Sequence, residues 1–271
     1  MSARCATCPH GCQLAPGPGA CRARTLAGGA YGRMTSLALD PYEKKPFACW
    51  RQGEWVLSCG SYGCNMSCPW CQNASISCAG EHDVAWQFVS PKALVDRALD
   101  LRAHGCTGLA FTYNEPLIAW EYVRDASRLA HVAGLATCVV SNGMATAAVL
   151  DEVLPHLDAA NIDLKAFNPE TYRLAGGSLA CVQETIQRMA ATPGFHLEVT
   201  TLIIPGLNDS EEEIDAASAW LARLNPEIPY HVTAFHPCHR MQDRPATSPN
   251  TVRKLAQVAR RHLNRVFTGN I

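Results

Sequence analysis

Three cysteines on one short segment are the first residues of this chain that could do chemistry. Cys64, Cys68 and Cys71 lie in GSYGCNMSCPWCQN with the spacing C-x3-C-x2-C. Thiolates this close together can converge on one metal centre, and soft sulfur ligands favour an iron–sulfur cluster or zinc over magnesium or calcium. A structural zinc ion takes four protein ligands, so three thiols indicate a centre with an open coordination position. A [4Fe-4S] cluster bound by three cysteines has such a position on its fourth iron.

A closed zinc site is the alternative for the same segment. Cys59 and Cys78 lie nearby in the sequence, and either could provide a fourth thiolate. The spacing favours the open cluster over this closed site.

A second group of four cysteines lies near the N-terminus. Cys5, Cys8, Cys12 and Cys21 have the spacing C-x2-C-x3-C-x8-C, with His10 between them, among glycine and proline turns. Four thiols in so short a segment indicate a closed metal site, which could hold zinc or an auxiliary iron–sulfur cluster. A segment with few core residues would gain folding free energy from such a metal. Reduced thiols without a metal are the alternative.

The total of 14 cysteines also bears on the cellular compartment. The first residues, MSARCATCPHGC, lack the apolar core of a signal peptide, so we expect a cytoplasmic protein whose clustered thiols bind metal or do redox chemistry. Three isolated cysteines in apolar surroundings are interpreted as small core residues: Cys106, Cys138 and Cys181. In HPCHRM, Cys238 lies between His236 and His239 and could contact a substrate or a metal.

Alternating β-rich and helical segments must position these residues. Six largely apolar runs predict buried parallel strands, at residues 54–59, 108–113, 136–141, 159–164, 197–204 and 230–235. The helices between them have clear N-terminal signals, such as Ser90-Pro91, the capping box Ser210-x-x-Glu213 and Ser248-Pro249. Repeated β-then-α units predict an α/β fold, either a doubly wound sheet or a partial barrel. In both architectures the chemistry lies at the carboxyl ends of the strands.

Polar side chains end most of the predicted strands. Residues 112–116 read TYNEP and 141–143 read SNG, Asp163 and Lys165 end the fourth strand, and His231 lies in the sixth. Such acceptors and donors could together form one polar binding site. Each residue also has a simpler interpretation: Asn114 or Ser141 could cap a helix, Asp163 and Lys165 could form an ion pair, and His231 could be structural. Their recurrence along successive strands favours a shared site.

These motifs resemble the radical S-adenosylmethionine (radical SAM) superfamily, whose loop after the first strand carries C-x3-C-x2-C with an aromatic residue before the last cysteine. Over nearly its full length the chain resembles the AmmeMemoRadiSam branch, which is related to pyruvate formate-lyase activating enzymes. The matching stretches are CPHGC, DPYEKKPF, GCNMSCPWCQN, FTYNEP, NIDLKAFNP, TTLIIPGLND, YHVTAFHP and FTGNI. Asn114-Glu115 departs from the family's Gly-Gly-Glu-type segment, and Cys238 replaces an aromatic residue that is usual in the branch.

The resemblance implies a partial (β/α)6 TIM-like barrel over residues 51–271, preceded by a cysteine-rich N-terminal extension over residues 1–50. It implies that Cys64, Cys68 and Cys71 bind a [4Fe-4S] cluster and that S-adenosylmethionine binds its open iron. Reductive cleavage would give methionine and a 5′-deoxyadenosyl radical that abstracts hydrogen from a substrate. The residues implied to contact the cofactor are Trp70, Asn114, Glu115, Ser141, Asn142, Asp163, Lys165 and His231.

Composition and resemblance together limit the partners. The chain has 271 residues and a net charge of −1, which argues against nonspecific nucleic-acid binding, and no apolar run approaches the roughly 20 residues that cross a bilayer. The resemblance implies a single-electron donor such as flavodoxin or ferredoxin, and a protein, peptide or small-molecule substrate. Two alternatives stay open, a glycyl-radical-enzyme activase and a non-catalytic zinc-binding module. Many such activases have a ferredoxin-like insertion after the cluster loop, and this chain lacks it.

Overall fold

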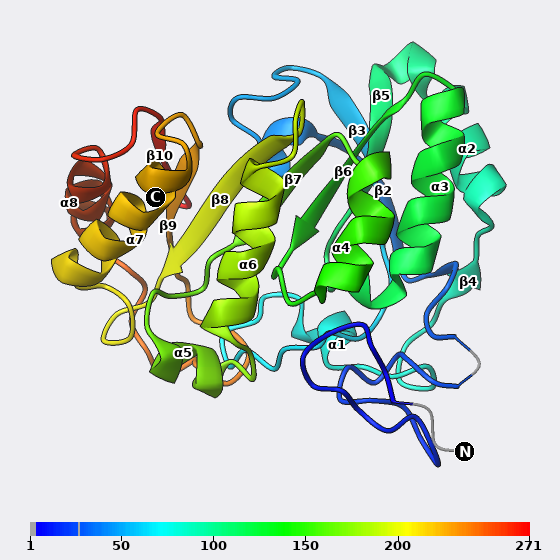
Figure 1. Cartoon of the computed structure of the whole chain (residues 1–271), viewed down its shortest axis with the longest axis horizontal. Coiled ribbons are helices and arrows are strands. Elements are labelled where there is room, and N and C mark those ends of the chain that lie inside the picture. The colour runs from blue at the N-terminus through cyan, green and yellow to red at the C-terminus, as the bar shows by residue number, and fades with distance from the viewer. Residues whose placement is uncertain (1–3, 27) are drawn as a thin grey trace.

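The computed structural model describes residues 4–26 and 28–271 and is built around one eight-stranded sheet (Figure 1). Across the sheet the strand order is β10-β9-β8-β7-β6-β5-β3-β2. Only β2 at one edge is antiparallel to its neighbour, and the other strands run parallel. Their bounds are β2 (Ser36–Pro41), β3 (Trp55–Gly60), β5 (Cys106–Phe111), β6 (Ala136–Ser141), β7 (Ala159–Asp163), β8 (His196–Ile203), β9 (Tyr230–Ala234) and β10 (Val266–Gly269).

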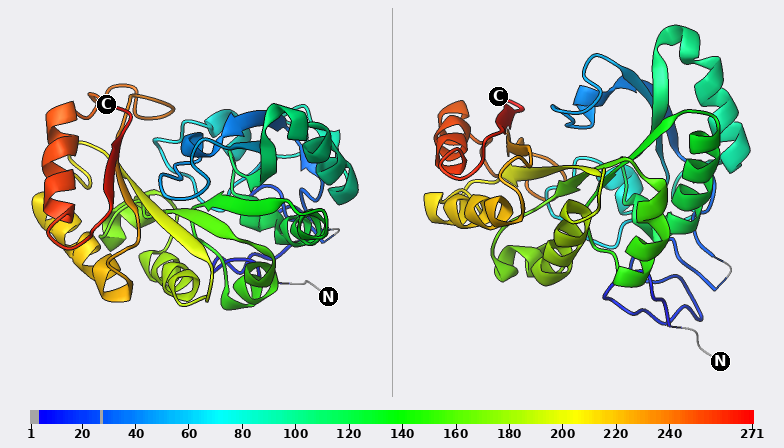
Figure 2. Two further views of the ribbon diagram at one scale, coloured as in Figure 1. Left: turned by 90° about the horizontal axis from the view of Figure 1, so that it is seen from above. Right: turned by 45° about the horizontal axis from the view of Figure 1, so that its top comes forward.

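Helices follow the parallel strands and cover the outer side of the sheet. Figure 2 shows that the sheet curves, with β2 and β10 on either side of an opening, so the fold is a partial TIM-like barrel. The helices are α1 (Ala74–Ser77), α2 (Pro91–Asp100), α3 (Trp120–Val132), α4 (Ala147–Val153), α5 (Pro169–Leu174), α6 (Leu179–Ala190), α7 (Glu211–Leu224) and α8 (Pro249–Ala259). In the part of the chain that the structure describes, no helix is long and apolar enough to span a membrane.

The six predicted strands are confirmed within two residues at each end. The predicted helix starts are confirmed as well, because the hydroxyls of Ser90, Ser210 and Ser248 each accept a hydrogen bond from the backbone N–H three residues later. The capping box is only half formed. The Glu213 carboxylate accepts hydrogen bonds from the backbone N–H of Phe167 and the amide of Asn168, which joins α7 to the end of β7.

Two strands of the sheet, β2 and β10, were not among the six predicted. β2 lies inside the first 50 residues and pairs with β3 along its whole length, so this part of the predicted extension belongs to the sheet. β10 has four residues and pairs with β9. A further two-stranded sheet joins β1 (Arg33–Met34) to β4 (Gln87–Phe88). These elements depend on ladder pairing with partners far along the chain and have little hydrophobic pattern of their own.

The segment after β2 closes one end of the barrel. Asp40 and Lys45 form a buried ion pair of 2.8 Å, and the Tyr113 hydroxyl donates to the same carboxylate at 2.6 Å. Burial raises the pKa of Asp40, but the hydrogen bonds that it accepts outweigh burial and hold this pKa well below its usual range. The donors are Lys44, Lys45 and Tyr113. These contacts hold the loop against the end of β5 and give a role to the DPYEKKPF stretch.

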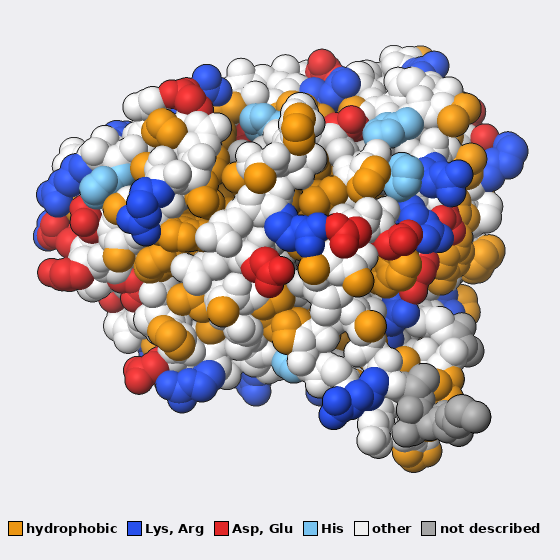
Figure 3. Space-filling model, viewed as in Figure 1, with side chains coloured by type: hydrophobic (Ala, Val, Ile, Leu, Met, Phe, Trp, Pro, Cys, Tyr) orange, Lys and Arg blue, Asp and Glu red, His pale blue; other side chains and the backbone are white. Residues whose placement is uncertain are grey.

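On the face in Figure 3, basic and acidic side chains are interspersed.

Replacing Lys45 by Met should destabilise the fold strongly. We expect the free energy of unfolding, measured by urea denaturation, to fall by about 3 kcal/mol, because Asp40 stays buried without its buried cation. Lys92→Met is the matched control, since it removes an exposed ion pair with Asp96 and should cost about 0.5 kcal/mol or less. Equal losses in the two variants would contradict a structural role for the buried pair.

Candidate functional site

One cavity at the centre of the barrel collects the thiols of the three-cysteine loop and most of the predicted polar residues. Its volume is about 710 Å³. The predicted residues that line it are Cys64, Cys68, Trp70, Cys71, Asn114, Glu115, Asn142, Asp163, Lys165 and His231. Ser141 lies behind the wall, where its buried hydroxyl donates to Glu115 at 2.8 Å. Predicted residues from five strands or the loops that follow them therefore face one space.

The three thiols lie on the loop after β3, which has little regular secondary structure. Cys64 Sγ accepts hydrogen bonds from the backbone N–H of Met66 at 3.3 Å and from the Asn142 amide at 3.4 Å. Cys71 Sγ lies 3.1 Å from the hydroxyl of Ser77 in α1. Such donors stabilise thiolates that bind metal. Burial raises the pKa of Cys64 and brings that of Cys68 to about 11, so metal binding would have to displace their protons.

The three thiols of this loop are not arranged around a single ion. Within residues 4–26 and 28–271, no three His, Cys, Asp or Glu side chains lie so that they could hold one metal ion. The thiolates of a cluster bind different irons, so their sulfur atoms need not meet around one point. Cys59, one candidate for a fourth zinc ligand, is buried in β3 and donates to the carbonyl of Ala110. Neither it nor Cys78 lines the cavity.

The four N-terminal cysteines form part of a compact head below the cluster loop (Figure 1). Cys12 Sγ accepts from the backbone N–H of Ala20 at 3.3 Å, and Cys21 Sγ accepts from that of Arg24 at 3.4 Å. The thiols of Cys5 and Cys21 both lie close enough to raise the pKa of Cys8, although burial is the larger cause. The head gathers these side chains but does not place three of them around one ion. A metal at the head stays a prediction.

Most hydrogen bonds of the Asn114 and Glu115 side chains are made with other groups of the protein. The Asn114 amide accepts from the backbone N–H of Ser61 and donates to the carbonyls of Tyr62 and Gly63. The Glu115 carboxylate accepts from Leu117 N, Ser141 Oγ and Asn142 N, at 2.8 to 2.9 Å. A carboxylate has about four acceptor positions, so one is left for a ligand. Burial raises the pKa of Glu115 to about 7 despite these donors.

Asp163 and Lys165 form the ion pair that their spacing suggested, and the pair lines the cavity. The Lys165 ammonium lies 2.7 Å from the carboxylate. Burial lowers the pKa of Lys165, but Asp163 and the nearby thiols outweigh burial, and the net pKa is raised. The cavity therefore contains a cation beside the three thiols.

His231 enters the cavity from below, near the start of β9 and not at its carboxyl end. Its Nε2 lies 2.5 Å from Glu198, which also accepts from His196 and from the backbone N–H groups of Ala48 and Cys49. Glu198 was not predicted, although a single carboxylate inside the apolar run LEVTTLII is a visible signal. Burial raises the pKa of Glu198, but these hydrogen bonds outweigh it and lower the pKa to about 2.

Tyr113 is a second residue that the sequence analysis missed. Its backbone φ is +74°, a left-handed conformation that is unusual for a large side chain. The hydrogen bond from its hydroxyl to Asp40 and the Lys45 ammonium 4.3 Å from its ring centre hold it in place. The turn at Tyr113 directs Asn114 and Glu115 toward the cluster loop.

The HPCHRM segment contacts the cluster loop from outside the cavity. The Cys238 thiol donates to the carbonyl of Trp70 at 3.2 Å, and the backbone N–H of Arg240 donates to that of Pro69 at 2.9 Å. His236 lies 3.0 Å from the carbonyl of Asn270. Neither His236, Cys238 nor His239 lines the cavity, and a contact with substrate or metal stays a prediction.

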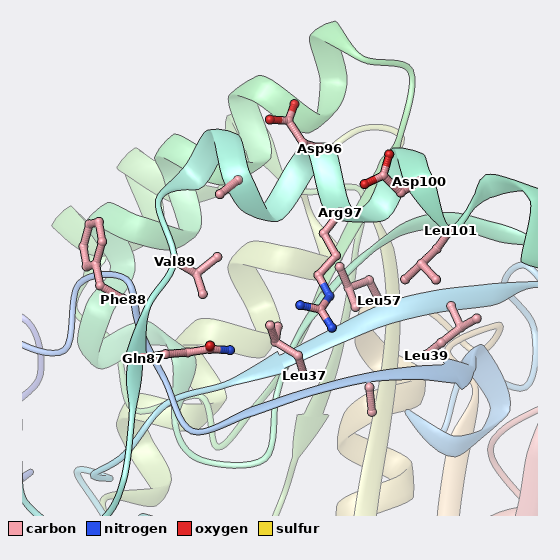
Figure 4. Close-up of a pocket in the computed structure, with 12 residues that line it drawn as sticks. Leu37, Leu39, Leu57, Gln87, Phe88, Val89, Asp96, Arg97, Asp100 and Leu101 are labelled. Carbon is pink, nitrogen blue, oxygen red and sulfur yellow. The ribbon is translucent and has the colours of Figure 1, made fainter.

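A second hollow of about 700 Å³ lies on the outer side of the barrel, between α2 and the edge strand β2 (Figure 4). Leu37, Leu39 and Leu57 form its apolar side, and the Arg97 side chain extends from α2 toward these leucines. It contains no cysteine and none of the predicted site residues, so the chemistry belongs to the central cavity.

Comparison with known proteins agrees with this geometry. Residues 59–217 match the profile of the Radical SAM superfamily. An uncharacterized protein of Methanocaldococcus jannaschii is 32% identical over 277 residues, covering 99% of this chain and 81% of that protein. The pyruvate formate-lyase 1-activating enzyme of Escherichia coli K12 is 25% identical, covering 64% of this chain and 73% of the enzyme.

Two further comparisons cover smaller parts. The isethionate sulfite-lyase activating enzyme of Desulfovibrio desulfuricans is 28% identical over 53% of this chain, which spans 46% of that enzyme. The crystal structure of a domain of a pyruvate formate-lyase activating enzyme from Bacteroides vulgatus superposes with a TM-score of 0.53, at 21% identity, over 60% of this chain and 99% of that domain. This structural likeness supports the fold.

The hydrogen bonds of Glu198 make a prediction about acid stability. Its pKa is lowered on folding, from 4.5 to about 2, so its contribution is present above pH 5 and is lost as the pH falls toward 2. We expect Glu198→Gln to remove roughly 3 kcal/mol of this pH dependence, measured as the free energy of urea unfolding from pH 6 to pH 2. Parallel pH profiles for the wild type and the variant would contradict the prediction, because they would show that folding does not lower the pKa of Glu198.

Proposed function

The chain belongs to the radical SAM superfamily, and on that premise we propose that it holds a [4Fe-4S] cluster on Cys64, Cys68 and Cys71 and cleaves S-adenosylmethionine reductively. It is an enzyme of the type of the pyruvate formate-lyase activating enzymes. The observation that carries the proposal is that three thiols, a cation and several acceptors from separate strands line one cavity. When bound, the cluster and S-adenosylmethionine supply the chemistry, which is formation of a 5′-deoxyadenosyl radical that takes hydrogen from a substrate.

The protein's own residues bind and orient the cofactor. Lys165 keeps its charge inside the cavity through Asp163, so it can bind the carboxylate of S-adenosylmethionine. Asp163 has oxygen left to accept from the ribose hydroxyls. The remaining acceptor position of Glu115 can hold the ammonium group, whose positive charge would favour the ionised carboxylate. Trp70 is buried in the wall beside Cys71, where it can flank the adenine and exclude water.

His231 lies at the floor of the cavity, where its imidazole ring can form a hydrogen bond to the cofactor. Because Glu198 only accepts, His231 donates to it through Nε2, and this fixes the plane of the imidazole ring. Phe267 stacks on the ring with centres 5.3 Å apart. The imidazole thus has one orientation before any ligand binds.

The substrate is proposed to reach the cavity through the open side of the barrel, between β2 and β10. Relatives named as activating enzymes favour a protein or peptide substrate and an external one-electron donor such as flavodoxin or ferredoxin. Activation of a glycyl radical enzyme is a second candidate, and the same relatives favour it. The short segment between the cluster loop and β5, without a ferredoxin-like insertion, distinguishes this chain from many such activases.

Anaerobic reconstitution with iron and sulfide tests the proposal. We expect a brown protein with absorbance near 400 nm that forms 5′-deoxyadenosine from S-adenosylmethionine under a strong reductant. Cys68→Ser should lose the product and the part of the chromophore that belongs to this loop, because only two thiolates remain there. Cys106→Ser is the matched control, since Cys106 is buried in β5 and donates to the carbonyl of Gly108, away from the cavity.

Two results would contradict the proposal. A colourless wild-type protein that retains zinc after reconstitution would favour a binding module. A brown protein whose chromophore and product survive in Cys68→Ser would show that the cluster, if present, lies elsewhere in the chain.

A further inference from the structure

Cys64 is the cluster-loop thiol whose neighbours on both sides touch the N-terminal head. Gly63 packs directly against the carbonyl of Cys21, and a Cβ at position 63 would lie 2.4 Å from that oxygen. The carbonyl of Asn65 accepts a 2.7 Å hydrogen bond from His10 Nε2. The head is also joined to the start of α4, where the Thr146 hydroxyl donates to the carbonyl of Ala6 at 2.7 Å. It is therefore fixed both to the loop and to the barrel.

The side chain of Asn65 continues this contact to the thiol itself. Asn65 is 3% exposed, and its amide donates to the carbonyl of Met144 at 2.7 Å. Its Oδ1 accepts from the Asn142 amide at 2.9 Å, and the same amide donates to Cys64 Sγ at 3.4 Å. The backbone N–H of Met144 donates to Asn142 Oδ1 at 2.8 Å. Both polar atoms of the Asn142 side chain thus have defined partners, and its amide N–H groups point to Asn65 and the thiol.

We propose that the cysteine-rich head, through Asn65 and Asn142, fixes the N–H···S hydrogen bond on Cys64 and so raises the reduction potential of the cluster. This inference rests on the proposed function, because it requires the cluster on Cys64. Asn142 acts on the ligand thiolate, and Asn65 and His10 are positioning residues. The role differs from the contact with S-adenosylmethionine that the resemblance implied for Asn142.

The direction of the effect follows from charge. Reduction adds negative charge to the cluster and its sulfur ligands, so a hydrogen-bond donor stabilises the reduced form more than the oxidised form. The bond lies in a buried site, where it is screened less than in water. Removing the Asn142 amide, or allowing it to move away from Cys64, should make the reduction potential of the cluster more negative.

Potentiometric titration of the reconstituted full-length protein, followed by the EPR signal of the reduced cluster, tests this. We expect Asn142→Ala to shift the midpoint potential in the negative direction. His10→Ala leaves all thiols and their direct donors in place, and we expect a smaller shift in the same direction. Asn168→Ala is the matched control, because Asn168 caps α5 and bonds to Glu213, away from Cys64. It should lower stability without moving the potential.

The outcomes separate this inference from the proposed function. A wild-type protein without a [4Fe-4S] signal overturns both. A cluster whose potential is unchanged in Asn142→Ala overturns the role of the amide, and an unchanged potential in His10→Ala overturns the influence of the head. If Asn142→Ala does not assemble a cluster, His10→Ala alone decides, since it alters no group that touches a thiol.

Discussion

The buried carboxylate of Glu115 is the contact on which the site depends. It is 2% exposed, and burying a carboxylate is costly unless donors surround it. The backbone N–H of Asn142, the hydroxyl of Ser141 and the N–H of Leu117 meet this need, so the end of β6 is held against the turn after β5. Asn142 then extends this arrangement to Cys64. The position of the Cys64 thiol therefore follows from the hydrogen bonding of a carboxylate that lies just after the neighbouring strand β5.

Glu198 does similar work at the floor of the cavity. It is fully buried and joins β8 to His231 in β9 and to the backbone of the 41–50 segment. Two buried carboxylates thus stabilise the barrel: Glu115 near the cluster loop and Glu198 beneath it. The loop between β2 and β3 is held by Glu198 on one side and by the pair of Asp40 and Lys45 on the other.

The fold was largely predictable because its strands are short apolar runs with helical segments between them. Such a pattern requires parallel pairing with both faces covered. Serine and proline at helix starts added the boundaries of α2, α7 and α8. β2 and β10 could not be predicted in this way, because each is an edge strand whose existence depends on hydrogen bonds to a partner far along the chain.

By itself, the sequence determined the cysteine spacing, the charged and amide residues at strand ends and therefore the class of cofactor. Only the tertiary structure decided how those side chains are used. The resemblance grouped Asn114 and Asn142 as cofactor contacts, which stays a prediction. The structure adds that Asn114 bonds to the backbone of the cluster loop and that Asn142 bonds to Cys64. The spacing of residues along the sequence indicates which side chains lie on the same strand end or loop. Their hydrogen-bond partners depend on side-chain orientation, and that orientation is fixed only when segments distant in the sequence pack together.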